Sequence, residues 1–143
     1  MRCVITRGLP GSGKSTYIKK NYPDVVACSA DNAFIKNGVY QFDASRIKEA
    51  HQSCMKQFLS AMIRRDPLVV VDNTNISLWE ASPYVAVAEA CGYAVCFVRF
   101  DVSVETAAAR NVHGVPHDRI KAMAQRFERS LPWWEEIRID GNG

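Results

Sequence analysis

Residues 8 to 16 read GLPGSGKST, and this glycine-rich run constrains the chain more than any other feature of its sequence. It follows the apolar run VIT and precedes a segment of helical character that starts near Lys14. Between a strand and a helix, glycines let consecutive backbone N–H groups approach a phosphate, and the helix start favours its negative charge. The pattern therefore predicts a phosphate-binding loop, with a plain glycine-rich turn as the alternative.

The loop contributes backbone donors and functional side chains. We expect Lys14 to reach the β- and γ-phosphates and the Ser15 hydroxyl to ligate Mg²⁺. We also expect Thr16 to help orient the α-phosphate. The predicted cofactors are therefore ATP and Mg²⁺. The residues expected to bind the nucleotide in this loop are Gly8, Pro10, Gly11, Ser12, Gly13, Lys14, Ser15 and Thr16.

Short runs rich in β-branched residues alternate with segments of helical character, which predicts a parallel α/β sheet. The run LVVV is apolar throughout, as expected of a strand buried on both faces. With the phosphate loop, this order predicts a three-layer P-loop NTPase fold of the adenylate-kinase-like kinase type, with a parallel sheet of about four to five strands, helices on both faces and a small lid. The expected strands cover 2–6, 25–28, 68–71 and 94–100, with a short edge strand in the ending IRIDGNG before a frayed tail.

Helical patterns fill the spaces between these strands. The pattern over 45–65 is amphipathic and predicts a helix of about five turns. Ser77 and Glu80 offer a capping box for the next helix, Pro83 predicts that it restarts in a second register, and Gly92 is expected to end it. Two further helices are expected over 103–111 and 116–130.

The size and composition fit one P-loop kinase domain over residues 1–143, since 48% hydrophobic residues suffice for one core. The net charge of +3 permits an anionic substrate but falls short of a dedicated nucleic-acid surface. The five cysteines include no CxxC pair, so we expect reduced thiols rather than a zinc site or a disulfide framework. The phosphate loop begins at Gly8 and no apolar run approaches a membrane span, so we expect a cytoplasmic protein without a membrane partner.

Asp31 follows the apolar run VVAC, which places a carboxylate at the carboxyl edge of an expected strand. Ligands of open α/β sheets bind at this edge. A phosphoryl acceptor hydroxyl must lose its proton, and one positioned carboxylate suffices in kinases. Asp31 is therefore the candidate general base, and an N-cap for the segment after it is the alternative.

A polar run, Asp72 to Asn75, ends the expected strand LVVV. We expect Asp72 to support Mg²⁺, either through water or through a hydrogen bond to Ser15. The side chains of Asn73, Thr74 and Asn75 are expected to position the acceptor. A turn with side-chain-to-backbone hydrogen bonds is the alternative, and it explains Asn75 better than Asp72.

Two basic side chains, Arg110 and His113, flank the bend that contains Gly114 and Pro116. A mobile lid around 110–118 would bring positive charge to the γ-phosphate, and charge neutralisation is the main catalytic need in phosphoryl transfer. Arg110 is therefore a candidate catalytic and nucleotide-binding residue, with a solvated surface arginine as the alternative. His113 is a candidate contact to the acceptor, and a solvated surface histidine is an equal alternative.

The chain resembles the P-loop polynucleotide 5′-kinases, and more closely the kinase-like module found in an animal ubiquitin-ligase-binding protein and its relatives. The resemblance extends over nearly the whole chain in matching order and spacing. The blocks that carry it are RGLPGSGKST, SADNAF, GVYQFD with EAH after it, VVVDNTN with WEASPYV, GYAVCFVRFD and ARNVHGVPHDRI.

This resemblance implies a role for several positions. Lys14 and Ser15 would bind ATP and magnesium, Asp31 would be the base, and Arg110 would lie in the lid. Asp72 and Asn75 match the family's acid and asparagine after the third strand. The resemblance also adds a substrate class, the 5′-hydroxyl end of RNA or DNA, and implies a role in the repair of broken ends.

The chain departs from the phage-type enzymes at Phe34, where they carry an arginine that engages the substrate phosphate. Phe34 is instead a candidate for stacking on a base, with Tyr40 and Phe42 as helpers. Packing at the sheet edge is the alternative for all three. The lid is one residue shorter than in the phage enzymes, with His113 near their second arginine. For His51, in the EAH block, we favour a place in the core over a substrate contact.

Three functions remain open from the sequence. The leading one is an ATP-dependent kinase of nucleic-acid 5′ ends. A kinase of a small-molecule hydroxyl uses the same loop, acid and lid. The third is a non-catalytic ATP-binding switch or adaptor, for which Trp133 and Trp134 are a candidate docking patch, although packing in the core is the commoner fate of such residues. Asp31 argues against the switch, because a switch needs no second carboxylate at an acceptor.

Overall fold

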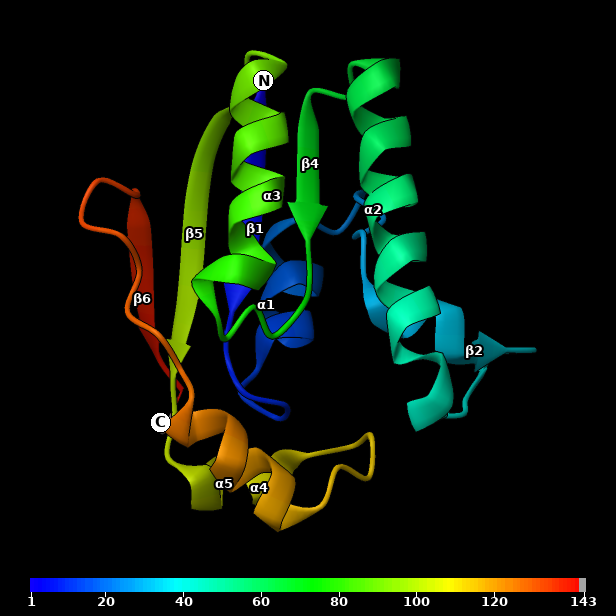
Figure 1. The fold of residues 1–143 in the computed structure, drawn as a ribbon, viewed down its shortest axis with the longest axis vertical. Helices are drawn as coiled ribbons and strands as arrows, with labels where there is room; N and C mark the ends of the chain where they lie inside the picture. Colours follow the sequence, from blue (N-terminus) through cyan, green and yellow to red (C-terminus); the bar gives the residue numbers. More distant parts are fainter. Residues whose placement is uncertain (142–143) are drawn as a thin grey trace.

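A parallel sheet of four strands forms the centre of the molecule, in the order β4-β1-β5-β6 (Figure 1). The computed structural model describes residues 1–141. Each neighbouring pair of strands runs parallel, which confirms the predicted α/β class. The strands are β1 (Arg2–Arg7), β4 (Leu68–Val71), β5 (Ala94–Asp101) and β6 (Glu136–Asp140).

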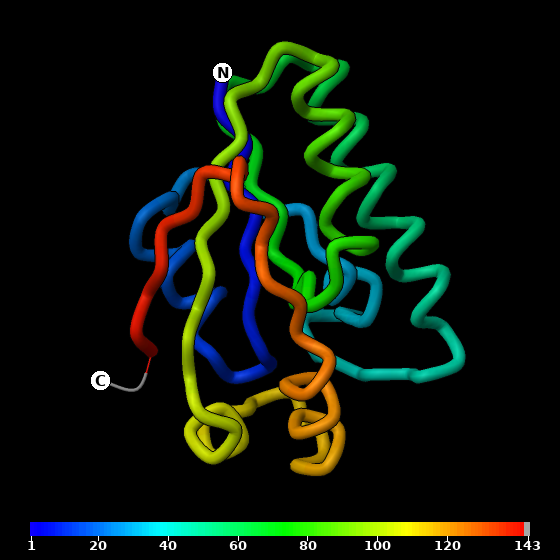
Figure 2. Tube along the Cα trace, turned by 60° about the vertical axis from the view of Figure 1, so that its left-hand side comes forward, coloured from blue at the N-terminus to red at the C-terminus, as the bar shows by residue number. Residues whose placement is uncertain are grey.

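Helices cover both faces of this sheet, as predicted. On one face, α2 (Ile47–Arg64) and α3 (Leu78–Ala90) share a core with Cys3 and Ile5 of β1. On the other face, Ile18 of α1 (Lys14–Asn21) packs with alternate strand residues such as Val4. Figure 2 shows α1 on the side of the sheet opposite to α2 and α3. The sheet is thus buried on both faces, which explains the unbroken apolar runs in its inner strands.

A small subdomain lies at the carboxyl end of the strands (Figure 1). It consists of α4 (Val104–Arg110), α5 (His117–Gln125) and the connection between them, and its buried residues Ala107 and Ile120 share a small apolar cluster with Leu9 of the loop after β1. It contains residues 110–118, the expected lid, whose movement stays a prediction; we call this subdomain the lid. A hairpin of β2 (Ile35–Lys36) and β3 (Val39–Tyr40) contacts this subdomain. Short 3₁₀ turns at Ala30–Phe34 and Ala44–Arg46 flank this hairpin.

The strand predicted over 25–28 is wrong except at its last residue. Only Cys28 pairs with β4, accepting from the Asp72 N–H at 2.9 Å and donating to the Val70 carbonyl at 2.8 Å. Upstream, a turn from Tyr22 to Val25 leads the chain away from β4, and Val26 is 89% exposed. The side chains of Val25 and Ala27 pack toward α1 instead. The apolar character of residues 25–27 therefore reflects side-chain packing and not strand pairing.

Two helix predictions also need correction. α3 runs without a break through Pro83, and Ser77 caps it by accepting from the Glu80 N–H at 3.2 Å. Pro83 lies on the exposed side of the helix, where its missing N–H removes one bond without starting a new register. The helix predicted over 116–130 ends at Gln125. Beyond it the backbone is irregular, and Phe127 packs against Arg7 and Arg99, with each guanidinium 4.9 Å from its ring centre.

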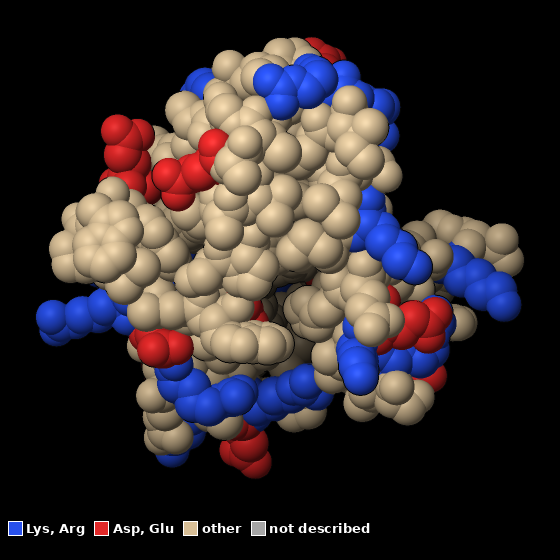
Figure 3. Space-filling view, turned by 45° about the horizontal axis from the view of Figure 1, so that its top comes forward, with Lys and Arg blue, Asp and Glu red and all other residues tan. Residues whose placement is uncertain are grey.

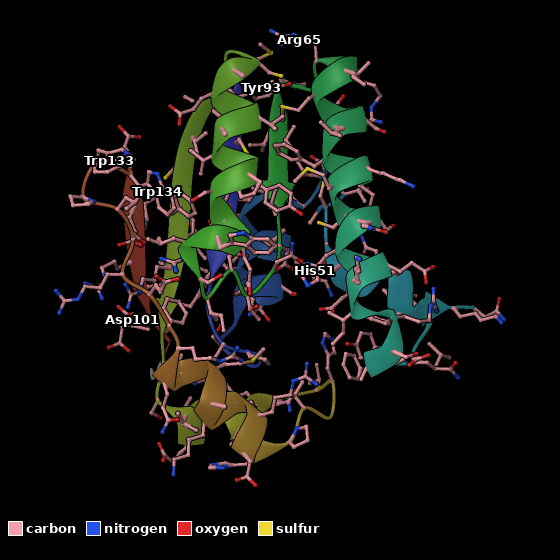
Figure 4. The ribbon with its side chains drawn as sticks, viewed as in Figure 1. His51, Arg65, Tyr93, Asp101, Trp133 and Trp134 are labelled. Atoms are coloured by element: carbon pink, nitrogen blue, oxygen red, sulfur yellow. The ribbon has the colours of Figure 1, made fainter. Side chains whose placement is uncertain are left out.

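The final segment contains the expected edge strand, since β6 pairs with β5 alone. Asn142 and Gly143, the predicted frayed tail, lie outside the described residues. The two tryptophans before β6 have different surroundings (Figure 4): Trp134 stacks on Phe97 at 4.4 Å, whereas Trp133 is 75% exposed. Trp134 is therefore partly buried and packs against the core. Within residues 1–141, no helix combines the length and the apolar character that crossing a membrane requires.

Candidate active site

The loop between β1 and α1 has the backbone that its glycines predict. Gly11 and Gly13 adopt φ angles of 82° and 100°, in the left-handed region that favours glycine. The Ser12 N–H donates to the Leu9 carbonyl at 3.1 Å, which closes a turn. Among residues 1–141, Ser12 Oγ is the buried side-chain polar atom without a hydrogen-bond partner. An unpaired hydroxyl inside the loop fits a site that binds a polar ligand.

The loop packs directly on the lid at Gly11. A Cβ at this residue would lie 2.1 Å from the Ala107 carbonyl oxygen of α4. We expect Gly11→Ala to push the loop and α4 apart, which would lower both the free energy of unfolding and the affinity for ATP. Urea unfolding and nucleotide titration measure the two effects.

A matched control for this variant is Gly92→Ala. Gly92 has a similar φ of 83° but no heavy atom within 4 Å of the added Cβ. This variant bears only the left-handed strain, about 1–2 kcal/mol, and should bind ATP normally. Equal losses in the two variants would show that the contact with Ala107 is unimportant.

Lys14 lies at the start of α1 with its ammonium turned back into the loop. Its Nζ donates to the carbonyl oxygens of Gly8 and Leu9 at 3.0 and 2.8 Å. Burial lowers the pKa of Lys14 to about 8, and the nearby carboxylates of Asp72 and Asp31 oppose this shift only in part. The side chain is thus positioned at the loop, but the nearby carboxylates do not fully offset the cost of burying its positive charge.

The lowered pKa of Lys14 predicts that nucleotide binding takes up a proton in alkaline solution. At pH 9, about nine in ten molecules would hold neutral Lys14, whereas anionic phosphates favour its charged form. Uptake should approach one proton per ATP at pH 9, and affinity should fall as the pH rises past 8. Calorimetry in buffers of different ionisation enthalpy measures this uptake.

Two variants serve as controls for the proton uptake. Lys14→Arg carries a group that stays protonated at this pH, so the uptake should vanish. Lys19→Arg, on the exposed side of the same helix, should keep it. Undiminished uptake in Lys14→Arg would assign the proton to another group.

Ser15 and Asp72 meet as expected. The Ser15 hydroxyl donates to Asp72 Oδ2 at 2.8 Å, and the Thr6 hydroxyl lies 3.4 Å from Asp72 Oδ1. One hydroxyl and one carboxylate side by side are oxygen ligands of the kind that Mg²⁺ takes. No group of three or more acidic, histidine or cysteine side chains suited to a metal occurs among residues 1–141. The residues therefore fit an ion that shares its coordination with phosphates and water.

The amides after Asp72 bind the protein itself, which corrects the expectation that they position the acceptor. Asn73 accepts from the Ala30 N–H at 2.9 Å through its side-chain oxygen, and its side chain is buried. Asn75 is 2% exposed and donates to the Thr6 carbonyl at 2.9 Å. The Asn75 side chain thus fixes the end of β4 against β1, and the Asn73 side chain fixes it against Ala30 and Cys54 of α2. Thr74 contributes its carbonyl to the Gly8 N–H at 2.9 Å, and an acceptor role for its side chain stays a prediction.

Asp31 lies at the carboxyl edge between the hairpin and the lid. Ser29 caps the turn that contains it, accepting from the Asp31 N–H at 3.2 Å, so Asp31 is not an N-cap. Its Oδ1 accepts from the Tyr40 hydroxyl at 3.1 Å, and its Oδ2 lies 3.6 Å from His113 Nδ1. The carboxylate is nearly half exposed. It is therefore held in place and still open to solvent.

The aromatic residues near Asp31 differ from the prediction. Phe34 is 4% exposed and packs on Phe42 with ring centres 5.3 Å apart, so it cannot stack on a substrate base. Tyr40, named from the sequence only as a helper, is the residue that contacts Asp31. The sequence did offer a signal for this contact. Asn37 and Gly38 favour a tight turn, and a tight turn brings the chain back toward Asp31. His51 is exposed on α2 rather than buried in the core (Figure 4).

The lid places Arg110 and His113 differently. The Arg110 guanidinium donates to the Gly141 carbonyl beyond β6, so it links the lid to the last strand. His113 instead reaches the hairpin at Tyr40 and Asp31. A second contact between lid and hairpin joins Arg119 to Phe42, with the guanidinium 5.3 Å from the ring centre. The structure thus brings His113 to the candidate base and leaves Arg110 at the lid's other side.

The sheet order, the phosphate loop and the adjoining carboxylates define a P-loop domain of the kinase type. A family model described as an AAA domain matches residues 3–135, and the chain belongs to this family. NEDD4-binding protein 2 of Homo sapiens is 36% identical to it over 133 residues, which cover 88% of this chain and 8% of the human protein. The chain therefore spans a small part of that relative's length.

Solved structures share the fold. A gluconokinase from Sinorhizobium meliloti 1021 superimposes with a TM-score of 0.61 at 16% identity, over 97% of this chain and 82% of its own. A chain of the Pnkp1/Rnl/Hen1 complex gives a TM-score of 0.60 at 22% identity, over 76% of this chain and 38% of its own. At these identities the likeness concerns the fold.

Proposed function

We propose that the chain is an ATP-dependent kinase that phosphorylates the 5′-hydroxyl end of RNA or DNA. The observation that carries the proposal is the position of Asp31, a solvent-accessible carboxylate that is near enough to Lys14 of the phosphate loop to act on its charge and that is separate from the pair Ser15 and Asp72. A domain that only binds a nucleotide has no use for this second carboxylate. A kinase needs it to accept the proton of the attacking hydroxyl.

Each group then has one task. ATP would supply the phosphoryl group, and a bound Mg²⁺ would neutralise part of the phosphate charge. Lys14 would exchange its contacts with the Gly8 and Leu9 carbonyls for phosphate oxygens, and Ser15 and Asp72 would hold the metal. Asp31 orients the acceptor hydroxyl and takes its proton. Arg110 would exchange its contact with the Gly141 carbonyl for the transferring group and add positive charge where that group becomes most negative.

The nucleic-acid acceptor is supported by the ordered sequence blocks shared with polynucleotide 5′-kinases and by the aromatic and basic residues near Asp31. Tyr40 lies at the carboxylate, and Arg119 lies on the facing helix. Figure 3 shows basic side chains gathered in a short band near the lower edge of the face in view, with acidic side chains beside them. Such a surface suits the end of a strand better than a long tract.

The test is phosphate transfer from γ-labelled ATP to short 5′-hydroxyl RNA and DNA oligonucleotides in the presence of Mg²⁺. The same oligonucleotides with a 5′-phosphate are the matched control, because they lack only the acceptor hydroxyl. We expect label on the 5′-hydroxyl strands alone, and transfer should weaken as salt is added. No transfer to either strand, with ATP bound, would overturn the proposal.

A small-molecule kinase is the second candidate, favoured by the fold shared with a gluconokinase over most of both chains. Sugars and sugar acids therefore belong in the same assay as alternative acceptors. Label on a sugar with none on an oligonucleotide would select this function. ATP binding without transfer to any acceptor would favour a switch.

A further inference from the structure

Two flat rings meet above the candidate base. Tyr40 of β3 and His113 of the lid stack with ring centres 4.1 Å apart and planes 16° from parallel. Both rings also contact Asp31, the Tyr40 hydroxyl at Oδ1 and His113 Nδ1 at Oδ2. Each oxygen of the carboxylate that an acceptor hydroxyl must reach therefore has one of the two rings beside it.

The rings belong to two separately built elements. Tyr40 follows a tight turn in which Asn37 and Gly38 take φ angles of 53° and 76°. His113 lies in a loop that Asn111 closes, accepting from the His113 N–H at 3.1 Å and donating to the Val115 carbonyl at 2.6 Å. Each ring thus has local backbone support of its own. Separation of lid and hairpin would part the two rings and leave each support intact.

We infer that Tyr40 and His113 form a two-sided stacking site for the base of the nucleotide that carries the acceptor hydroxyl. The inference rests on the proposed function and specifies how the acceptor is recognised. Aromatic rings in contact lie about 3.5–4 Å apart, so a base fits when the two rings separate to about 7–8 Å. Base stacking on aromatic side chains tolerates any base, as a kinase of diverse ends requires.

The same movement would free one oxygen of Asp31, the candidate general base. Entry of a ring between Tyr40 and His113 moves His113 away from Asp31 Oδ2, which lies only 3.6 Å from it in the closed arrangement. That oxygen is then available to the 5′-hydroxyl, which is one sugar away from the stacked base. Acceptors without a flat ring, such as sugar acids, cannot make this exchange. The stack thus favours nucleotide ends over sugars.

The experiment measures binding and stacking without phosphate transfer. A 5′-hydroxyl oligonucleotide with the fluorescent base 2-aminopurine at its first position is titrated with the full chain. A second oligonucleotide has an abasic first position. We expect quenching of the first probe on binding and about 10- to 100-fold weaker binding of the abasic strand, the range of a stacked base.

The variants test the rings themselves. Tyr40→Leu and His113→Leu should lose the quenching and bind the two strands about equally. Tyr40→Phe keeps the ring and should retain both effects, although it loses the hydroxyl that contacts Asp31. Trp133→Leu, which removes an exposed ring elsewhere (Figure 4), should behave as the wild type. Circular dichroism confirms that each variant is folded.

The outcomes separate the stacking site from the kinase activity. Label transfer by the wild type with equal affinity for abasic and intact ends would overturn the stacking site and leave the kinase standing. Quenching that needs both rings, without label transfer, would support the stacking site and overturn the kinase. Persistent discrimination in Tyr40→Leu and His113→Leu would place the base elsewhere.

Discussion

Replacing Asp31 by asparagine is expected to slow phosphate transfer to a 5′-hydroxyl oligonucleotide by about 10²–10⁴-fold, the usual contribution of a positioned general base. The amide has the shape of the carboxylate and still accepts from the Tyr40 hydroxyl, so the hairpin should keep its position. It cannot take the proton of the attacking hydroxyl. The measurement is the rate of label transfer at saturating ATP, with ATP affinity determined in parallel.

The matched control is Asp24→Asn, which neutralises an exposed carboxylate just before residues 25–27, the segment that does not pair with β4. This change should leave transfer and ATP affinity unaltered. A loss of less than about threefold in Asp31→Asn, far below the range for a general base, would exclude Asp31 from that role. A matching loss of ATP affinity would instead show that Asp31 supports the nucleotide site.

The phosphate loop was predictable because its chemistry is local. Glycines that need left-handed φ angles, a lysine and a serine lie within nine consecutive residues, and the flanking strand and helix determine their direction. Asp72 was predictable for the same reason, because it ends a buried strand beside β1. Parallel strands bring such residues to one edge whatever lies between them.

The environment of Asp31 was not predictable in this way. Its partners Tyr40 and His113 lie on a short hairpin and a lid loop, whose positions depend on packing between elements far apart in the sequence. The roles of Asn73 and Asn75 were missed because a polar run at a strand end suggests ligand contacts. Burial instead requires that these amides be paired within the protein.

Arg7 was also missed, although it connects the sheet to the loop edge. Arg7 is fully buried. Burial is the main cause that lowers its pKa, the charge of Arg99 lowers the pKa further, and Glu136 opposes the shift. A basic residue at the end of an apolar strand usually indicates that the strand has reached solvent. Here the segment after α5 folds over it, and nothing in the local sequence of β1 signals that cover.

Replacing Arg7 by methionine is expected to lower the free energy of unfolding by about 3–5 kcal/mol, because each buried acceptor left without a donor costs about 1–3 kcal/mol. The guanidinium donates through Nε to the Asn75 carbonyl at 2.7 Å and through Nη2 to the Ile76 and Glu128 carbonyls at 3.0 and 2.8 Å. Methionine fills similar space but leaves the Asn75 and Glu128 carbonyls without this donor, whereas the Ile76 carbonyl keeps the Glu128 N–H at 2.8 Å. Urea unfolding measures the change.

Arg129→Met is the matched control, because this arginine is exposed and should change stability by no more than about 0.5 kcal/mol. Arg7→Lys should fall between the two, since one ammonium cannot reach all the acceptors that a planar guanidinium serves. Arg7 directly precedes Gly8, and Asn75 lies three residues after Asp72. Loosening this junction should therefore also weaken ATP binding in the folded protein. A stable Arg7→Met variant with normal ATP affinity would mean that the loop is positioned by its glycines and the contact with α4 alone.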